Sequence, residues 1–503
     1  MKIFSKATLF FGAVAGLTLI QARWLWGMIT FEPGSLFPYV WIAIFCCLAM
    51  NISLLAVQSL FAAFGKEPFF SKAESKEIRS CPVALIYCVK NESFGLKERI
   101  RYTFGGNHLP AAHLWILSDS DANGKKEEEI LIEELRQEFG RGYVFYRNRA
   151  VPYERKQGNI HDWLVKSGSA YDYFIVCDAD SLLPQGWAEE VLRIAAHPEN
   201  ARIGVFQSAI YVTHEASVYA RMQAIGQYYS QRLYFYANQA AFGRSIAFGH
   251  NCLIRRTAFE TIKLPAKILS HDNWETALLE QQGYLTVFLP GIISYEEATP
   301  HYLEERKRAR RWLKGTLQGF PLLFLPGISF ATRFLIFYQI YLYLIQPALF
   351  FWIISGLLTA GSLRAEMFTA GKGSLSLLFF TLGVLFFHKF VVARSLGDIK
   401  RIIQETAFTT VLGLQNVFYG TLDLLILPLQ TLGWTPMSKN PDERPSLRDC
   451  IQTLAMGTGA GLLLFWIGLN RAPAWTVFAM PVLTSLVLSI PAVYFSSKQW
   501  RPS

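Results

Sequence analysis

The chain has 503 residues, of which 52% are hydrophobic and only 17% charged, and its formal net charge is +10. Soluble proteins usually carry about 25% charged residues, so the composition argues against an ordinary soluble protein and indicates a membrane protein with a sizeable polar part. An excess of Lys and Arg is typical of cytoplasmic loops, and no basic tract interleaved with aromatic residues indicates nucleic-acid binding. The seven cysteines form no CxxC pair, which argues against a zinc site and a disulfide framework.

Two apolar segments open the chain, Ala7–Ile29 and Pro38–Phe64, and each is long enough to cross a membrane as a helix. The first contains Arg23 and lacks a clear small-residue cleavage site, so we interpret it as a retained helix rather than a signal peptide. Four more spans are expected at Ala331–Leu358, Leu375–Val392, Thr453–Leu469 and Ala474–Phe495. The interrupted apolar stretch Ile402–Leu432 is expected at the interface or in a re-entrant hairpin, with seven or eight spans as alternatives.

Lysine and arginine flank the first two spans on one side, follow the fourth span and recur at the end of the chain. By the positive-inside rule these segments face the cytosol. The sequence therefore predicts an N-terminal transmembrane hairpin over residues 1–65, a cytosolic domain over 66–320, and C-terminal transmembrane and interfacial helices over 321–503.

Within the cytosolic part, short apolar runs alternate with polar helical stretches, which is typical of a mostly parallel sheet covered on both faces. The expected strands are Pro82–Val89, Ala112–Leu117, Tyr143–Tyr146, Tyr173–Cys177 and Ile203–Phe206, and the expected helices between them are Glu127–Glu138, Asn159–Lys166 and Trp187–Ala196. Ligands of such sheets bind beyond the carboxyl ends of the strands, so functional residues are expected just after each strand.

Two carboxylates, Asp178 and Asp180, directly follow the strand Tyr173–Cys177. A strand-end turn would account for them, but two carboxylates beside a diphosphate also suit Mg²⁺ or Mn²⁺, because hard cations prefer oxygen ligands. Asp119 and Glu92 follow two other strands. An Asx turn explains Asp119 as well as a hydrogen bond to a uracil or ribose does, and Glu92 has the same ambiguity.

Three further positions carry candidate chemistry. Lys156 precedes a helix, where it could pair with phosphate, although a solvated loop is the simpler interpretation. Asp272 opens a helix and could act as a general base, while its spacing to Glu275 also predicts a capping box. On the expected helix Pro300–Leu317, one face presents Arg308, Arg311 and Trp312, which suit a diphosphate and a sugar ring or, alternatively, a membrane-surface cluster.

Together these motifs resemble the processive family-2 glycosyltransferases, the group that includes cellulose, chitin and hyaluronan synthases. The closer resemblance is to the glucans biosynthesis glucosyltransferase H family of bacteria. The similar stretches are Ile116–Asp121, Arg155–Trp163, Cys177–Ser181, Phe248–Arg255, Leu269–Tyr284, Ser294–Pro300, Arg308–Gln318 and Leu483–Lys498. Arg308 and the run Ser270-His271-Asp272 replace the Gln and Thr-Glu-Asp of the wider group, which favours the periplasmic-glucan branch.

The resemblance implies an α/β domain of the GT-A type inserted between the transmembrane helices of a polytopic membrane protein. It also implies a role for each matching residue. On the donor side, Glu92 and Asp119 would contact uridine, Lys156 the nucleotide, Asp178 the diphosphate and Asp180 the metal ion. Asp272 would be the base, Arg311 and Trp312 would hold diphosphate and acceptor, and the acceptor side would be lined by Gly249, His250 and Asn251.

The implied activity is inverting, processive transfer of glucose from UDP-glucose to a β-1,2-linked periplasmic glucan, with Mg²⁺ or Mn²⁺ as cofactor. The spans from Ala331 onward would translocate the growing chain. A loop at residues 433–448 would gate the site, and the chain would reside in the bacterial inner membrane with its catalytic domain in the cytosol. Membrane lipid and an acyl carrier protein are the implied partners. Three alternatives remain: a synthase of another polymer (a β-1,4-glucan or an amino-sugar polymer), a transferase that adds one sugar to a lipid carrier, and a non-enzymatic transporter.

Overall fold

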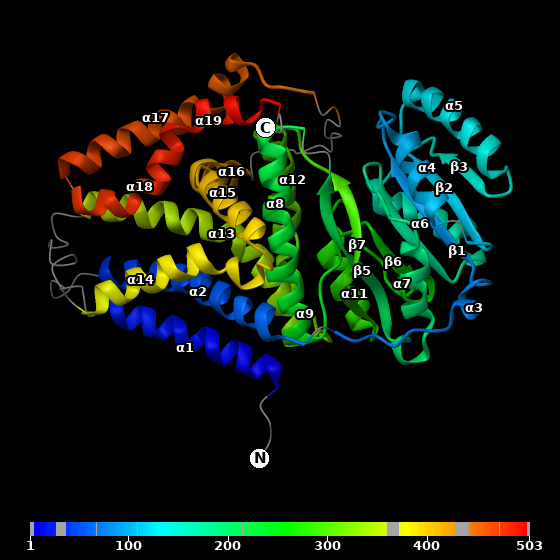
Figure 1. Cartoon of the computed structure of the whole chain (residues 1–503), viewed down its shortest axis with the longest axis horizontal. Helices are drawn as coiled ribbons and strands as arrows, with labels where there is room; N and C mark the ends of the chain where they lie inside the picture. The colour runs from blue at the N-terminus through cyan, green and yellow to red at the C-terminus, as the bar shows by residue number, and fades with distance from the viewer. Residues whose placement is uncertain are drawn as a thin grey trace.

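The computed structural model describes residues 5–26, 37–66, 68–107, 109–213, 216–359, 372–427, 440, 442–471 and 473–499. Figure 1 shows a sheet-containing part and a bundle of long helices side by side, with helices α8 (Val218–Ser230) and α12 (Tyr302–Leu317) between them. Of the expected gating loop, the residues Gly433–Pro436 lie outside the described residues.

The sheet has seven strands in the order β3-β2-β1-β4-β6-β5-β7. The strands are β1 (Val83–Val89), β2 (Ala112–Ser118), β3 (Val144–Asn148), β4 (Tyr173–Asp178), β5 (Ile203–Thr213), β6 (Cys252–Arg255) and β7 (Leu285–Glu297). All pairs are parallel except those of β6, which runs antiparallel to both β4 and β5. The five expected strands and the mostly parallel sheet are confirmed; β6 and β7 were not predicted.

Helices cover both faces of this sheet because its strands are apolar on both sides. Within β1, Val83, Leu85 and Tyr87 pack into one core while Ala84 and Ile86 pack into the other. The first core is closed by α4 (Leu96–Gly106), α5 (Ala122–Phe139) and α7 (Trp187–Ala196), and the second by α6 (Arg155–Ser167), α10 (Arg256–Phe259) and α11 (Asp272–Gln281). The three helices expected between the strands are thus found as α5, α6 and α7.

The helical bundle comprises α1 (Lys6–Trp26), α2 (Phe37–Phe64), α13 (Phe330–Thr359), α14 (Lys372–Phe387), α15 (Leu396–Leu412), α16 (Asn416–Ile426), α17 (Leu447–Arg471), α18 (Pro473–Val487) and α19 (Ser489–Ser496). Among the described residues, four helices are long and apolar enough to cross a membrane: α1, α2, α13 and α17. The expected span Ala474–Phe495 is two helices, α18 and α19, bent by 55°, and counts as a fifth if it crosses as one unit.

The remaining apolar segments differ from simple spans. The expected span Leu375–Val392 falls on the shorter helix α14, and the interrupted stretch after Ile402 contains α15 and α16. These helices and the four long ones are typical of a membrane protein. The division of the chain at residues 65 and 320 stays a prediction.

The sheet-containing part is packed against the bundle through α8, α9 (Tyr236–Phe242) and the π-helical turn Gln231–Phe235 between them. Met222 and Tyr229 of α8 share a core with Ile402 of α15, and Ala241 of α9 shares another with Phe10 of α1. The candidate site residues that follow β5 in the chain are therefore positioned by apolar helices of the bundle as well as by the sheet.

Candidate active site

The antiparallel strand β6 brings together two sequence motifs that are some seventy positions apart. Cys252 pairs with Val176, and the Asn251 amide donates to the Val176 carbonyl at 2.7 Å. Because the two strands run in opposite directions, the residues before β6 lie beside those after β4. Gly249 and His250 thus meet the Asp178-Ala179-Asp180 turn.

A cavity of about 430 Å³ opens at this edge of the sheet. Its lining includes Glu92, Asp119, Lys156, Asp178, Asp180, Gly249, His250, Asp272, Arg311 and Trp312. The structure therefore gathers all the residues singled out from the sequence except Asn251, which is fully buried and whose side-chain amide donates to the Tyr295 carbonyl at 3.1 Å. Their proximity does not test their roles, which stay predictions.

Lys156 is held between the acidic turn and the residues that precede β6. Its ammonium donates to an Asp178 carboxylate oxygen and, at 2.7 Å, to the Gly249 carbonyl. Burial by itself lowers the pKa of Lys156, but Asp178 raises it further, so the side chain stays charged. Glu154 and Arg155 just before it have φ of 50° and 54°, a left-handed backbone that is costly for residues with side chains and is concentrated at functional sites.

Asp272 is the first residue of α11, and the expected capping box is wrong. The N-cap is His271, which makes no side-chain cap bond, and the Glu275 amide donates to the His271 carbonyl at 2.7 Å. The Asp272 carboxylate instead accepts a hydrogen bond from the Ser270 hydroxyl at 2.8 Å. The physical reason is the register: the helix starts at Asp272, one residue earlier than a capping role for Asp272 requires.

Gly249 makes room for this carboxylate. A Cβ at Gly249 would lie 2.3 Å from Asp272 Oδ1, and its φ of +77° is a conformation that favours glycine. The Gly249 backbone therefore separates Asp272 on one side from Lys156, which its carbonyl binds, on the other. The Asp272 carboxylate and the Lys156 ammonium are thus fixed around one backbone position.

His250 forms a charged pair that the sequence did not reveal. Its Nε2 donates to Glu296 of β7 at 3.0 Å, and its Nδ1 lies 3.7 Å from Asp178. Burial alone would lower the pKa of His250, but Asp178 and Glu296 raise it to about 9. Burial alone would raise the pKa of Glu296, but the hydrogen bond from His250 lowers it to about 2. The pair is thus ionised at neutral pH and adds a cation beside Asp178.

Asp119 is engaged by a second residue that sequence reasoning missed. Arg149 donates to both of its carboxylate oxygens at 2.7 and 2.6 Å, and the Asn159 amide donates to Oδ1 at 3.1 Å. Such a bidentate arrangement fixes the carboxylate in one orientation. The only local signal for it was an arginine one residue beyond the end of β3.

The basic helix α12 contributes cations and an aromatic face to the cavity. The Arg308 guanidinium lies 4.4 Å from the centre of the Trp312 ring, as their i, i+4 spacing predicts. Burial and the neighbouring Arg308 lower the pKa of Arg311, whereas Glu92 raises it. Arg311 is therefore close to Glu92 from the first strand, and the two candidate donor-binding residues belong to one cluster.

The Asp178–Asp180 turn fits a divalent cation. Both carboxylates line the cavity and offer the oxygen ligands that Mg²⁺ and Mn²⁺ prefer. The cations Lys156 and His250 lie beside Asp178 and would attract an anionic ligand, whose oxygens could complete the shell. These two residues would hold the ion.

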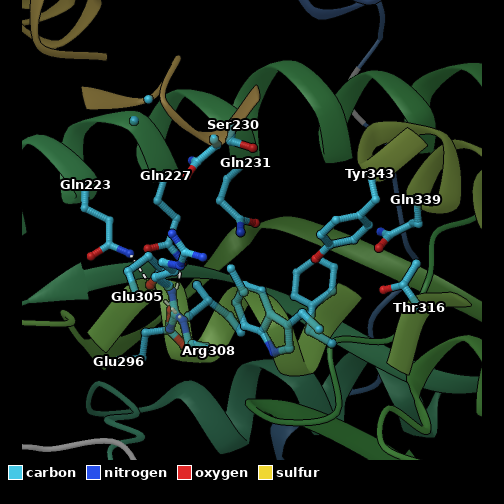
Figure 2. A pocket seen from close by; sticks show the side chains of 18 of the residues that line it. Gln223, Gln227, Ser230, Gln231, Glu296, Glu305, Arg308, Thr316, Gln339 and Tyr343 are labelled. Atoms are coloured by element: carbon cyan, nitrogen blue, oxygen red, sulfur yellow. Dashed lines mark hydrogen bonds and ion pairs between the residues drawn. The ribbon is translucent and has the colours of Figure 1, made fainter. Parts of the chain in front are cut away.

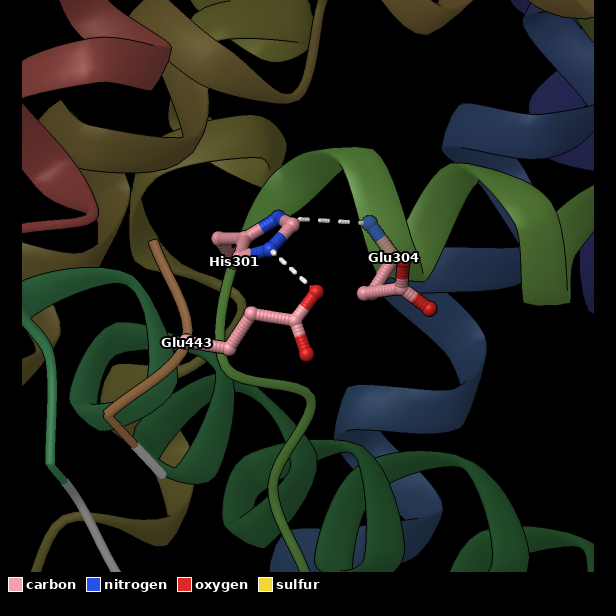
Figure 3. Close-up of side chains that lie close together, drawn as sticks. All are labelled: His301, Glu304 and Glu443. Carbon is pink, nitrogen blue, oxygen red and sulfur yellow. Dashed lines mark hydrogen bonds and ion pairs between the residues drawn. The ribbon is translucent and has the colours of Figure 1, made fainter. Parts of the chain in front are cut away.

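A second cluster, His301, Glu304 and Glu443, has side-chain ligand atoms close enough together to suggest a metal site (Figure 3). The His301 Nδ1 caps α12 by accepting the Glu304 amide at 3.4 Å, so in the neutral imidazole Nε2 carries the proton and faces Glu443 at 3.9 Å. A protonated Nε2 cannot ligate a metal, and Glu304 already pairs with Lys307. The cluster instead connects the segment before α17 to the start of α12.

A comparison with protein families gives a match that includes part of this cavity. Residues 173–391, which include the acidic turn, Asp272 and α12, match a family model described as Glycosyl transferase family group 2. The fold and this match indicate the class that the chain resembles: residues 173–391 are similar to family 2 glycosyltransferases, and apolar helices lie before and after the sheet-containing part.

The particular relatives are bacterial proteins named glucans biosynthesis glucosyltransferase H, as the resemblance implied. The protein of Pseudomonas syringae pv. tomato is 27% identical over 92% of this chain and 59% of its own length, and that of Pseudomonas aeruginosa is 27% identical over 86% and 55%. The chain therefore spans little more than half the length of these relatives. A solved mannosyltransferase of Pyrobaculum calidifontis, in complex with GDP-Man and Mn²⁺, has a TM-score of 0.47 and 13% identity, and the match covers 78% of this chain and 98% of that one.

Proposed function

We propose that the protein is a membrane glucosyltransferase that extends a β-glucan with glucose from UDP-glucose and inverts the configuration at the anomeric carbon. The observation that carries the proposal is the position of Asp272. Its carboxylate is held across the Gly249 backbone from Lys156 and Asp178, so a proton acceptor faces a cationic diphosphate site. The relatives' names support glucose and glucan as substrates.

In this mechanism Asp272 takes the proton of an acceptor hydroxyl while that oxygen attacks the anomeric carbon from the face opposite UDP. The bond from the anomeric carbon to the diphosphate oxygen breaks, and its electrons leave with UDP. Lys156, His250 and Arg311 stabilise the departing diphosphate as fixed cations. A divalent cation on Asp178 and Asp180 would neutralise further diphosphate charge when bound.

Asp119 and Glu92 would bind the uridine, and Trp312 would support the acceptor sugar. Inversion of an α-linked donor gives a β-linked product, and a periplasmic glucan of the β-1,2 type is proposed on the family resemblance alone. The inner membrane, with the catalytic domain in the cytosol, is the proposed location. Membrane lipid and an acyl carrier protein are proposed partners on the resemblance alone.

The test is transfer by purified protein in lipid, supplied with Mg²⁺ and radiolabelled UDP-sugars, followed by sizing and linkage analysis of the product. The Asp272→Asn variant should lose transfer by a factor of about 10² to 10⁴ but still bind UDP, because the variant keeps the shape of the side chain and leaves Lys156 in place. Full turnover by Asp272→Asn would refute the base assignment.

The main competing function is the addition of a single sugar to a lipid carrier. The placement of Arg311 and Trp312 in the cavity favours a polymer, since a ring-binding aromatic beside the base suits a sugar acceptor. A product that stays at one sugar on lipid would sustain the alternative, and a long β-1,4-glucan or an amino-sugar polymer would keep the synthase but change its branch.

A further inference from the structure

A cavity of about 320 Å³ lies where the end of α2 meets the sheet-containing part and the segment that follows α14. Its walls come from the last residues of α2, from β5 and β7, from the π-helical turn, and from the short turn Phe390–Val392 with the two residues after it. It shares no lining residue with the candidate active-site cavity. Its volume is within the range of about 300–1,000 Å³ that is typical of ligand sites.

Two arginines from different elements line this cavity. Arg232 belongs to the π-helical turn, where its guanidinium lies 5.2 Å from the centre of the Tyr228 ring, and Arg394 follows the turn Phe390–Val392. The lining contains no Asp or Glu, and neither guanidinium forms an ion pair with a carboxylate in the described part of the chain. The carboxylate of Asp398 accepts the Arg394 backbone amide at 2.9 Å but does not line the cavity. Because guanidinium groups pair closely with phosphate oxygens, the lining favours a phosphate group.

The cavity lies at the end of a candidate membrane span. The stretch Tyr39–Phe64 of α2 is long and apolar enough to cross a membrane, and its last turn forms part of the cavity wall. Around it, large apolar side chains are exposed: Phe64 is 82% exposed, Phe387 65% and Val391 43%. Lipid head groups lie at the level where spans end, and basic pockets between helices at that level suit the phosphate of anionic lipids.

The π-helical turn connects this cavity to the candidate active site. Gln231, the residue before Arg232, lines both this cavity and a larger one of about 580 Å³ that borders Asp272 (Figure 2). At the other end of the turn, the centre of the Phe235 ring lies 4.4 Å from that of Phe248, which lines the candidate active-site cavity. Such turns are frequent at functional sites. A ligand that binds Arg232 therefore also restrains a wall of the active site.

We propose that this cavity binds the phosphate group of an anionic phospholipid, on the membrane face next to the sheet-containing part, through Arg232 and Arg394. The acyl chains of that lipid lie against the exposed side chains of Phe64 and Val391. The bound lipid holds the π-helical turn and, through it, Phe248, so anionic lipid increases the rate of transfer. The effect on transfer rests on the proposed function, whereas the binding of the lipid does not.

The first experiment titrates the full chain in detergent with phosphatidylglycerol, or with the zwitterionic phosphatidylcholine, and measures bound lipid by native mass spectrometry. Phosphatidylglycerol should bind more tightly. Arg232→Gln should raise its Kd roughly 5-fold, the loss expected when one arginine beside an anionic head group is removed. Arg394→Gln should have the same effect, and its exposed position makes this variant informative even if Arg232→Gln does not fold.

Lys400→Gln is the matched control, because Lys400 is exposed on α15 and carries the same charge on the same segment as Arg394 but does not line the cavity. This variant should keep the wild-type Kd. An equal rise in Kd for Lys400→Gln would show attraction to the basic surface as a whole and would overturn the site. Displacement of the lipid by millimolar inorganic phosphate would assign the cavity to a soluble phosphate instead.

The second experiment measures transfer from UDP-glucose in nanodiscs of phosphatidylcholine with a rising fraction of phosphatidylglycerol. Wild type and Lys400→Gln should be stimulated, and Arg232→Gln and Arg394→Gln should lose the stimulation. Wild-type stimulation of both arginine variants would refute the connection through the π-helical turn. A wild-type protein that transfers no sugar from any UDP-sugar would overturn the proposed function, while the lipid titration would still decide whether the site exists.

Discussion

Glu275 lies one helical turn beyond Asp272 and is only 2% exposed. Burial, together with the Asp272 carboxylate, raises its pKa to about 8, and burial lowers the pKa of His271 on the other side of Asp272. At neutral pH both neighbours are therefore uncharged. Asp272 is thus flanked by the neutral side chains of Glu275 in α11 and of His271 at its N-cap. The proposed base therefore has no second negative charge beside it within this helix.

The protonated state of Glu275 has a consequence for stability. Between its ordinary pKa of 4.5 and the folded value of about 8, the folded protein holds a proton on Glu275 that the unfolded chain has released. Folding then binds a proton, so stability should fall as the pH rises through this interval. The melting temperature of the detergent-solubilised protein should drop between pH 6 and pH 8.5, and the drop should be smaller in Glu275→Gln. An identical drop in the variant would contradict the assignment.

Among single residues, the sequence indicated the side chains with candidate chemical roles but not the residues that contact them. Asp178, Asp180 and Asp272 were recognisable because each stands directly after a strand or at the start of a helix. Glu296 and Arg149 were not, because they approach His250 and Asp119 from other strands, and no local pattern encodes such a contact. The capping-box spacing of Asp272 and Glu275 was misleading, since a start shifted by one residue changes which side chain caps the helix.

At the scale of elements, α12 is held against α16 by ion pairs and a hydrogen bond. Asp423 of α16 lies 3.2 Å from Arg306 and 3.3 Å from Arg310, and the Tyr302 hydroxyl donates to Asn416 at 2.6 Å. The Arg306 guanidinium also lies 4.0 Å from the centre of the Tyr419 ring. The helix that carries Arg311 and Trp312 is therefore oriented by a helix of the bundle.

Removal of Asp423 should loosen this attachment. Asp423→Ala leaves two cations without their buried carboxylate, which should lower stability by about 3 kcal/mol and raise the KM for UDP-glucose by displacing Arg311. Thermal unfolding in detergent and a donor titration measure the two effects. Glu129→Ala, which removes an exposed i, i+4 pair with Lys125, should cost less than about 0.5 kcal/mol. Equal effects of the two substitutions would show that Asp423 does not hold α12 in place.

The elements themselves were predictable where their pattern was strong. Five strands with uninterrupted apolar runs were found at the expected places. The strand β6 has only four residues, and β7 contains Pro290 and Gly291 and an irregular register against β5, so neither has the continuous apolar pattern of a buried parallel strand. The bend between α18 and α19 was equally hidden in one apolar run.

For the whole molecule, the proposed orientation can be tested by labelling. If the sheet-containing part faces the cytosol, a cysteine at the exposed position Lys126 of α5 should resist a membrane-impermeant maleimide in intact cells and react after permeabilisation. Asn470, at the far end of α17, should show the opposite behaviour when replaced by cysteine, because α17 begins near α12 and is long enough to cross the membrane. Labelling of Lys126→Cys in intact cells would reverse the proposed topology.

Helices α8 and α9 lie between β5 and β6 in the chain, and this placement affects the order in which the parts of the site come together during folding. The acidic turn after β4 meets Gly249 and His250 only when the intervening chain has closed its loop, and that chain packs on α1, α2 and α15. We expect a newly made chain to complete this candidate site only once its first and later apolar helices have come together. A polypeptide released before that point would hold the acidic turn without its acceptor side, so the capacity to consume sugar nucleotide would arise together with membrane integration.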